Sequence, residues 1–183
     1  MAHLRRLRVP VKLELGSGHR GTRGYLHNDL HAFEGIDVPG KAWELDLDSE
    51  SLDEVLALGF VEHQTFYEAL DTFRNVYRML KPGGLFLFDV PNYPVWARYY
   101  LDALEGRETP VPMEHIRKTL FGWARWPGDE HKYGWDSQLL SDQLGECGFV
   151  MIYFDVHPFT ERAFRARFTN PTDAHLYAVA YKP

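Results

Sequence analysis

Short segments in which apolar and polar residues alternate, separated by glycine-rich turns, recur along the chain. Residues 11–15 alternate in this way and end at a pair of glycines, as a half-buried strand would. Similar or fully apolar segments predict further strands over residues 25–28, 43–47, 53–58, 85–90, 149–157 and 174–182.

Apolar residues at helical spacing predict an amphipathic helix over residues 65–80. Thr65 and Glu68 fit a capping box at its start, and Lys81-Pro-Gly-Gly84 forces a turn after its end. Further helices are predicted over residues 96–104, 115–123 and 137–147, the last capped by Asp136 or Ser137.

Strands that alternate with helices predict an α/β fold with a seven-stranded, Rossmann-like, mostly parallel sheet. The last two strands are expected to form a terminal antiparallel hairpin, with helices on both faces of the sheet. Too few residues separate Gly18 from Asp29 for a helix plus a strand, so the first helix after the glycine loop should be short or missing. We expect one domain, residues 1–183, in which residues 93–135 form an inserted cap that covers the substrate.

The composition excludes several classes of protein. A net charge of -6 argues against a nucleic-acid-binding domain, which is usually strongly basic. The single cysteine, Cys147, excludes an internal disulfide and suits a reducing compartment. No apolar segment follows residues 1–8 as in a signal peptide, and no segment approaches the ~18 apolar residues of a membrane span. We therefore predict a cytoplasmic protein without a membrane partner; the sequence leaves its oligomeric state open.

Candidate binding residues gather where the predicted strands end. Gly16 and Gly18 lack a Cβ, so the backbone there can turn sharply and let a ligand approach. Glu14 precedes this bend, and Asp29 and Asp46 end the next two predicted strands. Ligands bind at the carboxyl ends of strands in open α/β sheets, so these acids are expected around one ligand.

Several segments in this order resemble class I S-adenosylmethionine-dependent methyltransferases, and more narrowly the small bacterial type 11-like branch. The resemblance covers residues 11–92 well and the region from Gly148 onward loosely. The segments that carry it are Glu14-Leu-Gly-Ser-Gly18, Gly24-Tyr-Leu-His-Asn-Asp29, Asp46-Leu47, Leu58-Gly-Phe-Val-Glu-His63 and Leu80-Lys-Pro-Gly-Gly84.

The resemblance implies S-adenosylmethionine as the cofactor. It places the amino acid end of the cofactor at the glycine bend and near Glu14, the ribose at Asp29 and the adenine at Asp46 and Leu47. The full set of implied binding residues is Glu14, Gly16, Ser17, Gly18, Asp29, Leu30, Asp46, Leu47, Gly59 and Phe60. Arg20 or Arg23 is a substitute for a missing helix N-terminus in binding the carboxylate.

The implied reaction is methyl transfer to a small molecule, with oxygen as the expected acceptor atom. Such an acceptor needs a base near neutral pH, and His131 and His63 are the candidates. A helix-capping or surface role is the alternative for each histidine. Trp123, Trp126, Tyr133 and Trp135 are either an apolar lid or core residues.

Three other functions remain open on the sequence. The first is a module that binds S-adenosylmethionine without catalysis. The second is a methyltransferase that acts on RNA or another polymer through the arginines of residues 158–173, although a solvated loop explains them more simply. The third is an NAD(P)-dependent oxidoreductase, because residues 16–21 match G-x-G-x-x-G, but that motif should open a helix. No metal is expected, since no paired cysteines or regularly spaced histidines occur.

Overall fold

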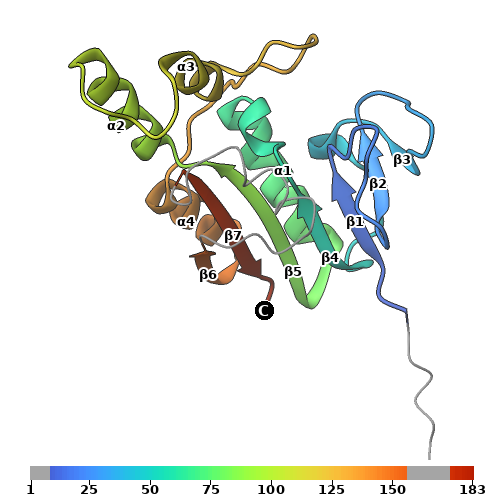
Figure 1. Ribbon diagram of the computed structural model, residues 1–183. Coiled ribbons are helices and arrows are strands. Elements are labelled where there is room, and N and C mark those ends of the chain that lie inside the picture. Colours follow the sequence, from blue (N-terminus) through green and yellow to red (C-terminus); the bar gives the residue numbers. More distant parts are fainter. Residues whose placement is uncertain (1–8, 156–173) are drawn as a thin grey trace, which may run out of the picture.

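The computed structural model describes residues 9–155 and 174–183 of the chain (Figure 1). Its elements, in chain order, are β1 (Lys12–Leu15), β2 (Leu26–Asp29), β3 (Val38–Pro39), the 3-10 turn η1 (Ala42–Glu44), β4 (Leu52–Ala57), the 3-10 turn η2 (Val61–His63), α1 (Phe66–Met79), β5 (Leu80–Pro91), α2 (Tyr93–Leu104), α3 (Met113–Phe121), α4 (Ser137–Glu146), β6 (Val150–Asp155) and β7 (His175–Tyr181).

The seven strands form one sheet in the order β3-β2-β1-β4-β5-β7-β6. The first five strands are parallel, while β7 runs antiparallel to both β5 and β6. The predicted sheet with its terminal antiparallel hairpin is confirmed. Because β1, β2, β4 and β5 run the same way, their carboxyl ends lie at one edge, where β7 begins.

The main core lies between one face of this sheet and the helices α1 and α4. Leu13, Val55 and Phe86 point from neighbouring strands toward Phe73 of α1 and Leu140 of α4, and all five are fully buried. A smaller apolar cluster holds Leu56, Leu58 and Tyr177, with Tyr25 and Leu87 packed against it. The apolar positions of β4, β5 and β7 therefore divide between the two clusters.

Helix α1 begins as its sequence predicts. The Thr65 side chain accepts a hydrogen bond from the backbone N–H of Glu68, and the Glu68 carboxylate accepts one from the backbone N–H of Thr65 at 2.8 Å. This capping box satisfies backbone donors that the first turn of a helix leaves unpaired. The predicted cap of α4 is confirmed too, since the Asp136 side chain accepts from the N–H of Leu139.

The predicted strand over residues 43–47 is wrong. The turn η1 overlaps the start of that segment, and the third strand is instead the two-residue β3, which lies between two of the predicted strands. The reason lies in α1, where Asn75 donates to the carbonyls of Ala42 and Leu45 and Arg78 donates to those of Leu45 and Leu47. Side chains thus pair backbone groups that a neighbouring strand would otherwise pair.

No helix connects β1 to β2, as predicted. The backbone N–H of Ser17 donates to the carbonyl of Asn28 at 3.0 Å, and the N–H of Thr22 donates to the carboxylate of Glu14. These bonds fold the glycine loop back onto the two strands that it joins. Asn28 in turn donates from its amide to the carbonyls of Val38 and Gly40, which holds β3 beside β2.

Helices α2 and α3 lie beyond the sheet edge at which β5 ends and β7 begins (Figure 1). They carry their own apolar cluster, in which Trp96 of α2 and Ile116 of α3 are fully buried together with Ala174. The Trp96 indole N–H donates to the Ala174 carbonyl at 2.8 Å, which fixes α2 to the residue before β7. Residues 93–121 thus form a separate layer at this edge.

The arginine-containing segment of residues 158–173, and the end of the strand predicted to reach residue 157, lie outside the described residues. Within the described ranges, no helix has both the length and the apolar character that crossing a membrane demands.

Removal of the α1 cap tests how much of the fold depends on this helix. Thr65→Ala should lower the free energy of unfolding by about 1 kcal/mol, because the N–H of Glu68 loses its acceptor. Thr65→Ser keeps the oxygen and is the control. Urea denaturation would measure both, and equal stability of the two variants would show that the capping box contributes nothing.

Candidate functional site

The glycine bend after β1 is closed by an aromatic ring from the end of β4. Gly16 adopts a φ of +59°, and a Cβ placed on it would lie 2.2 Å from a ring carbon of Phe60. Gly18 has a similar φ of +58°, but its Cβ would meet nothing within 4 Å. Only glycine therefore fits at position 16, since any side chain there would overlap the Phe60 ring.

Polar groups of this bend are buried and not fully paired. Glu14 is fully buried, with its carboxylate beside the N–H of Thr22. Among the described residues, the hydroxyls of Ser17 and Thr22 are buried without a hydrogen-bond partner. Buried hydroxyls normally bond to something, so this loop offers donors and acceptors to a polar ligand.

Asp29, at the end of β2, lies against the same bend. Its Oδ2 accepts a hydrogen bond from the N–H of Gly18, and its Oδ1 accepts from the N–H of His31, each at 2.9 Å. A carboxylate oxygen has more than one acceptor site, so both oxygens keep capacity for a ligand hydroxyl. Leu30, the next residue, is 58% exposed and has a side chain free to cover a ligand.

Asp46 does not end a strand, which differs from the expectation. It follows the turn η1 and is exposed, while the carbonyl of Leu47 accepts from Arg78 at 2.6 Å. The residue that follows β3 is Gly40, whose N–H donates to the carbonyl of Asp29 at 3.0 Å. The strand ends therefore bring Glu14 and Asp29 together, and Asp46 lies on a separate segment.

A buried carboxylate lies just beyond β4. Glu62, in η2, is 4% exposed, and its Oε2 has no hydrogen-bond partner among the described residues. Burial, and after it the nearby negative charge of Asp89, raises the pKa of Glu62 to about 8. The surroundings of Glu62 therefore disfavour the charged form of its carboxyl group.

The two histidines predicted to be catalytic meet beside this carboxylate. Their rings pack edge to face with centroids 4.9 Å apart, and Nδ1 of His63 lies 3.1 Å from the carbonyl oxygen of Glu130. Burial lowers the pKa of His63, and burial followed by the charge of His63 lowers the pKa of His131 to about 4. Both imidazoles are therefore neutral near pH 7.

A hairpin over residues 121–131 carries His131 to this place. Gly122 and Glu130 form an antiparallel bridge, and the guanidinium of Arg125 donates two 2.9 Å bonds to the carboxylate of Asp129. The N–H of Lys132 then donates to the carbonyl of Glu62 at 2.8 Å, which attaches the hairpin to η2. The meeting of the histidines is thus fixed by backbone and ion-pair contacts.

The four aromatic residues of this region divide between the two roles expected for them. Tyr133 and Trp135 pack with Phe66 of α1 and belong to the main core. Trp123 and Trp126 are 39% and 53% exposed, and the guanidinium of Arg125 lies 4.3 Å from the Trp126 ring centroid. Only these two tryptophans are therefore available to cover a ligand.

A second histidine and carboxylate pair was not found from the sequence. Nδ1 of His175, at the start of β7, lies 3.6 Å from Oδ2 of Asp89, near the end of β5. Oδ1 of Asp89 accepts from the N–H of Gly59 at 2.7 Å. The antiparallel pairing of the predicted terminal strand with β5 was the signal that could have placed these residues together.

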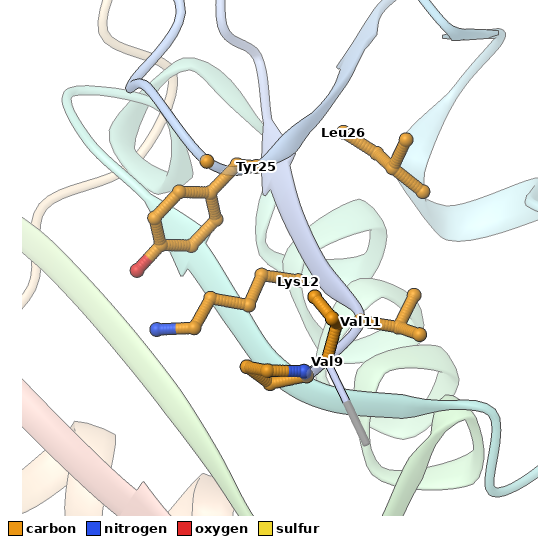
Figure 2. A pocket seen from close by; sticks show the side chains of 7 residues that line it. Val9, Val11, Lys12, Tyr25 and Leu26 are labelled. Carbon is orange, nitrogen blue, oxygen red and sulfur yellow. The ribbon is translucent and has the colours of Figure 1, made fainter. Parts of the chain in front are cut away.

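A shallow hollow of about 340 Å³ lies at the opposite end of the strands (Figure 2). It is lined by residues 9–12 and 24–26, which lead into β1 and β2. The Tyr25 hydroxyl donates to Glu54, with which Lys12 forms a 2.8 Å ion pair. Because these residues precede the carboxyl ends of the strands, the hollow is separate from the candidate site.

Residues 25–88 match the family described as "Methyltransferase domain". Comparison with curated protein sequences finds no match.

The fold resembles that of several solved methyltransferases. An S-adenosylmethionine-dependent methyltransferase from Mesorhizobium loti aligns with a TM-score of 0.60 and 20% identity, over 94% of this chain and 91% of that one. Phosphoethanolamine N-methyltransferase 2 from Haemonchus contortus, with S-adenosyl-L-methionine bound, aligns with a TM-score of 0.59 and 14% identity, over 95% and 49%. A Haloferax volcanii putative methyltransferase, in complex with the Trm112 activator, aligns with a TM-score of 0.57 and 16% identity. The alignment covers 96% of this chain and 84% of that one.

Residues 25–88 thus match a methyltransferase domain, and the fold resembles that of S-adenosylmethionine-dependent methyltransferases. The residues of the bend fit a polar cofactor of this kind, because the hydroxyls of Ser17 and Thr22 are buried without a partner beside the buried carboxylate of Glu14.

Alanine substitutions in the bend should distinguish the effect of steric overlap with Phe60 from the effect of left-handed backbone strain. Gly16→Ala should abolish binding of S-adenosylhomocysteine, because its Cβ would displace the Phe60 ring. Gly18→Ala carries the same left-handed strain, of about 1 kcal/mol, without an overlap, and is the matched control. Isothermal titration calorimetry would measure both; equal affinities would show that Phe60 does not shape the bend.

Proposed function

We propose that this methyltransferase transfers a methyl group from S-adenosylmethionine to an oxygen atom of a small molecule. The observation that carries the proposal is the line from the glycine bend, through Phe60 and the turn η2 that follows it, to Glu62 and the two histidines. The cofactor lies at one end of this line and the acceptor at the other. Residues 93–135 are the segment proposed to cover the acceptor.

The cofactor is proposed to lie across the bend and the end of β2. Glu14, Gly16, Ser17 and Gly18 bind its amino acid end, while Asp29 and Leu30 meet the ribose. Two unpaired hydroxyls and a buried carboxylate at the bend support the first part of this assignment. Gly59 and Phe60 border the methionine arm, and Asp46 and Leu47 remain the residues proposed for the adenine.

Two backbone N–H groups of the bend are already used within the protein and are not free to bind the cofactor. The N–H of Ser17 donates to the carbonyl of Asn28, and the N–H of Gly18 donates to the carboxylate of Asp29. Side-chain groups must therefore bind the carboxylate of the cofactor. Arg20 and Arg23, both exposed in this loop, are the proposed cations.

The chemistry of the step is an in-line displacement. When bound, S-adenosylmethionine would supply an electrophilic methyl group for an acceptor oxygen, with the carbon–sulfur electron pair left on sulfur. The proton that the acceptor hydroxyl loses would pass to His63 or His131. His63 and His131 are proposed to contact the acceptor oxygen. The Glu130 carbonyl can only accept, so Nδ1 of His63 carries the proton and Nε2 presents a lone pair.

The proposed partner is a small molecule, with neither a nucleic acid nor a membrane required. A reducing, cytoplasmic environment is proposed from Cys147, a free and half-buried thiol.

Thermal shift of the protein with candidate cofactors tests the binding half of the proposal. S-adenosylmethionine and S-adenosylhomocysteine should raise the melting temperature, and NAD should not, because a ligand stabilises the state that binds it. Asp29→Ala should weaken S-adenosylhomocysteine binding by about 2 kcal/mol, roughly thirtyfold in Kd.

Asp37→Ala is the matched control for this substitution. Asp37 also accepts a backbone N–H, that of His27 at 2.9 Å, from the neighbouring loop. Equal affinities of the two variants would remove Asp29 from the binding site, and stabilisation by NAD alone would overturn the choice of cofactor.

Substitution of the histidine pair tests the catalytic half. His63→Ala and His131→Ala should each lower kcat by about 100-fold or more, with the Kd of S-adenosylhomocysteine unchanged. Release of S-adenosylhomocysteine over a panel of hydroxylated and carboxylated small molecules would measure turnover. Wild-type turnover in both variants would remove the pair from the acceptor site.

A further inference from the structure

Glu62, His63 and His131 have the arrangement of a metal site. Each offers one ligand atom, and the three atoms all lie within 4.8 Å of one another. A zinc ion is bound at about 2.0–2.2 Å by imidazole nitrogen and carboxylate oxygen, so small side-chain rotations would bring all three atoms onto one ion.

A hydrogen bond from each histidine ring to the backbone supports this arrangement. Nδ1 of His63 lies 3.1 Å from the Glu130 carbonyl, and a ring nitrogen of His131 is hydrogen-bonded to the backbone of Thr119. Histidines that bind metals usually donate their other ring N–H to a carbonyl or carboxylate, which fixes the tautomer and orients the ring. In both residues one nitrogen is thus tied to the backbone and the other is left for a ligand.

The state of Glu62 is an independent observation. Glu62 is only 4% exposed, and its Oε2 has no hydrogen-bond partner among the described residues. An unpaired buried carboxylate is costly, and a bound cation would neutralise it. The carboxylates of Asp89 and Asp129 also act electrostatically on Glu62 and add to the negative potential there.

We propose that Glu62, His63 and His131 bind a divalent transition-metal ion, with Zn²⁺ as the ion that best suits the ligands. Two imidazoles and one carboxylate are a borderline donor set that suits first-row divalent ions better than Mg²⁺ or Ca²⁺. Three protein ligands leave at least one coordination position open.

The open position suggests what the cation does, and this part of the inference rests on the proposed function. An acceptor oxygen bound there would be oriented and would lose its proton more readily, because a divalent ion lowers the pKa of an oxygen that it binds. With the ion present, His63 and His131 would hold it and act on the acceptor oxygen through it, in place of direct contact. The acceptors would then be molecules with a hydroxyl or carboxyl group able to coordinate the ion.

Metal titration of untagged, chelator-treated protein tests the site directly. Isothermal titration calorimetry with Zn²⁺ should give one ion per chain, and Co²⁺ should give the visible absorption bands of a low-symmetry nitrogen and oxygen site. Glu62→Gln, His63→Gln and His131→Gln should each weaken Zn²⁺ binding about tenfold or more. Glu130→Gln is the matched control, because that exposed side chain bonds to Gly128 outside the site.

Each outcome decides the proposal. Weaker binding in the three ligand variants with an unchanged Glu130→Gln variant supports it, and the wild-type Co²⁺ spectrum supports it even where a variant fails to fold. Absence of one-to-one binding, or equal affinity in all four variants, overturns it. S-adenosylhomocysteine binding measured in chelator is separate: its loss would overturn methyl transfer and leave the metal site standing.

Discussion

The contact between Gly16 and Phe60 is the constraint on which the site depends. The bend after β1 and the residue after β4 come from adjacent parallel strands, and the ring fills the space that a side chain at Gly16 would need. This contact sets how closely the glycine loop approaches η2. It therefore sets the distance between a cofactor at the bend and the polar groups around Glu62.

The buried side chain of Glu62 is a feature that packing alone does not explain. A buried glutamate with an unpaired oxygen destabilises the folded state, and a glutamine or leucine would cost less there. Backbone contacts nevertheless hold it in place, because its own carbonyl accepts from Lys132 and thereby attaches the hairpin that carries His131. A buried carboxylate that destabilises the folded state is better explained by ligand binding than by a role in the stability of the fold.

Much of the fold could be predicted from local patterns, because strand alternation and the Thr65 capping box are decided by neighbouring residues. The strand expected over residues 43–47 failed because its partners, Asn75 and Arg78, come from a later helix. The meeting of His63 with His131 could not be predicted from spacing. The sequence predicts each histidine as a catalytic base on its own. The hairpin closed by Arg125 and Asp129 is what brings the two together.

The missing helix after β1 changes how the cofactor end of the site works. A helix there would offer free N–H groups and a positive dipole to the carboxylate of the cofactor. Here the Ser17 and Gly18 amides bond to β2 instead, so their contribution is to hold Asp29 against the bend. Affinity must then come from side chains of an open loop, whose charges are screened by salt. A cofactor site built in this way should bind more weakly at high ionic strength than one built on a helix N-terminus.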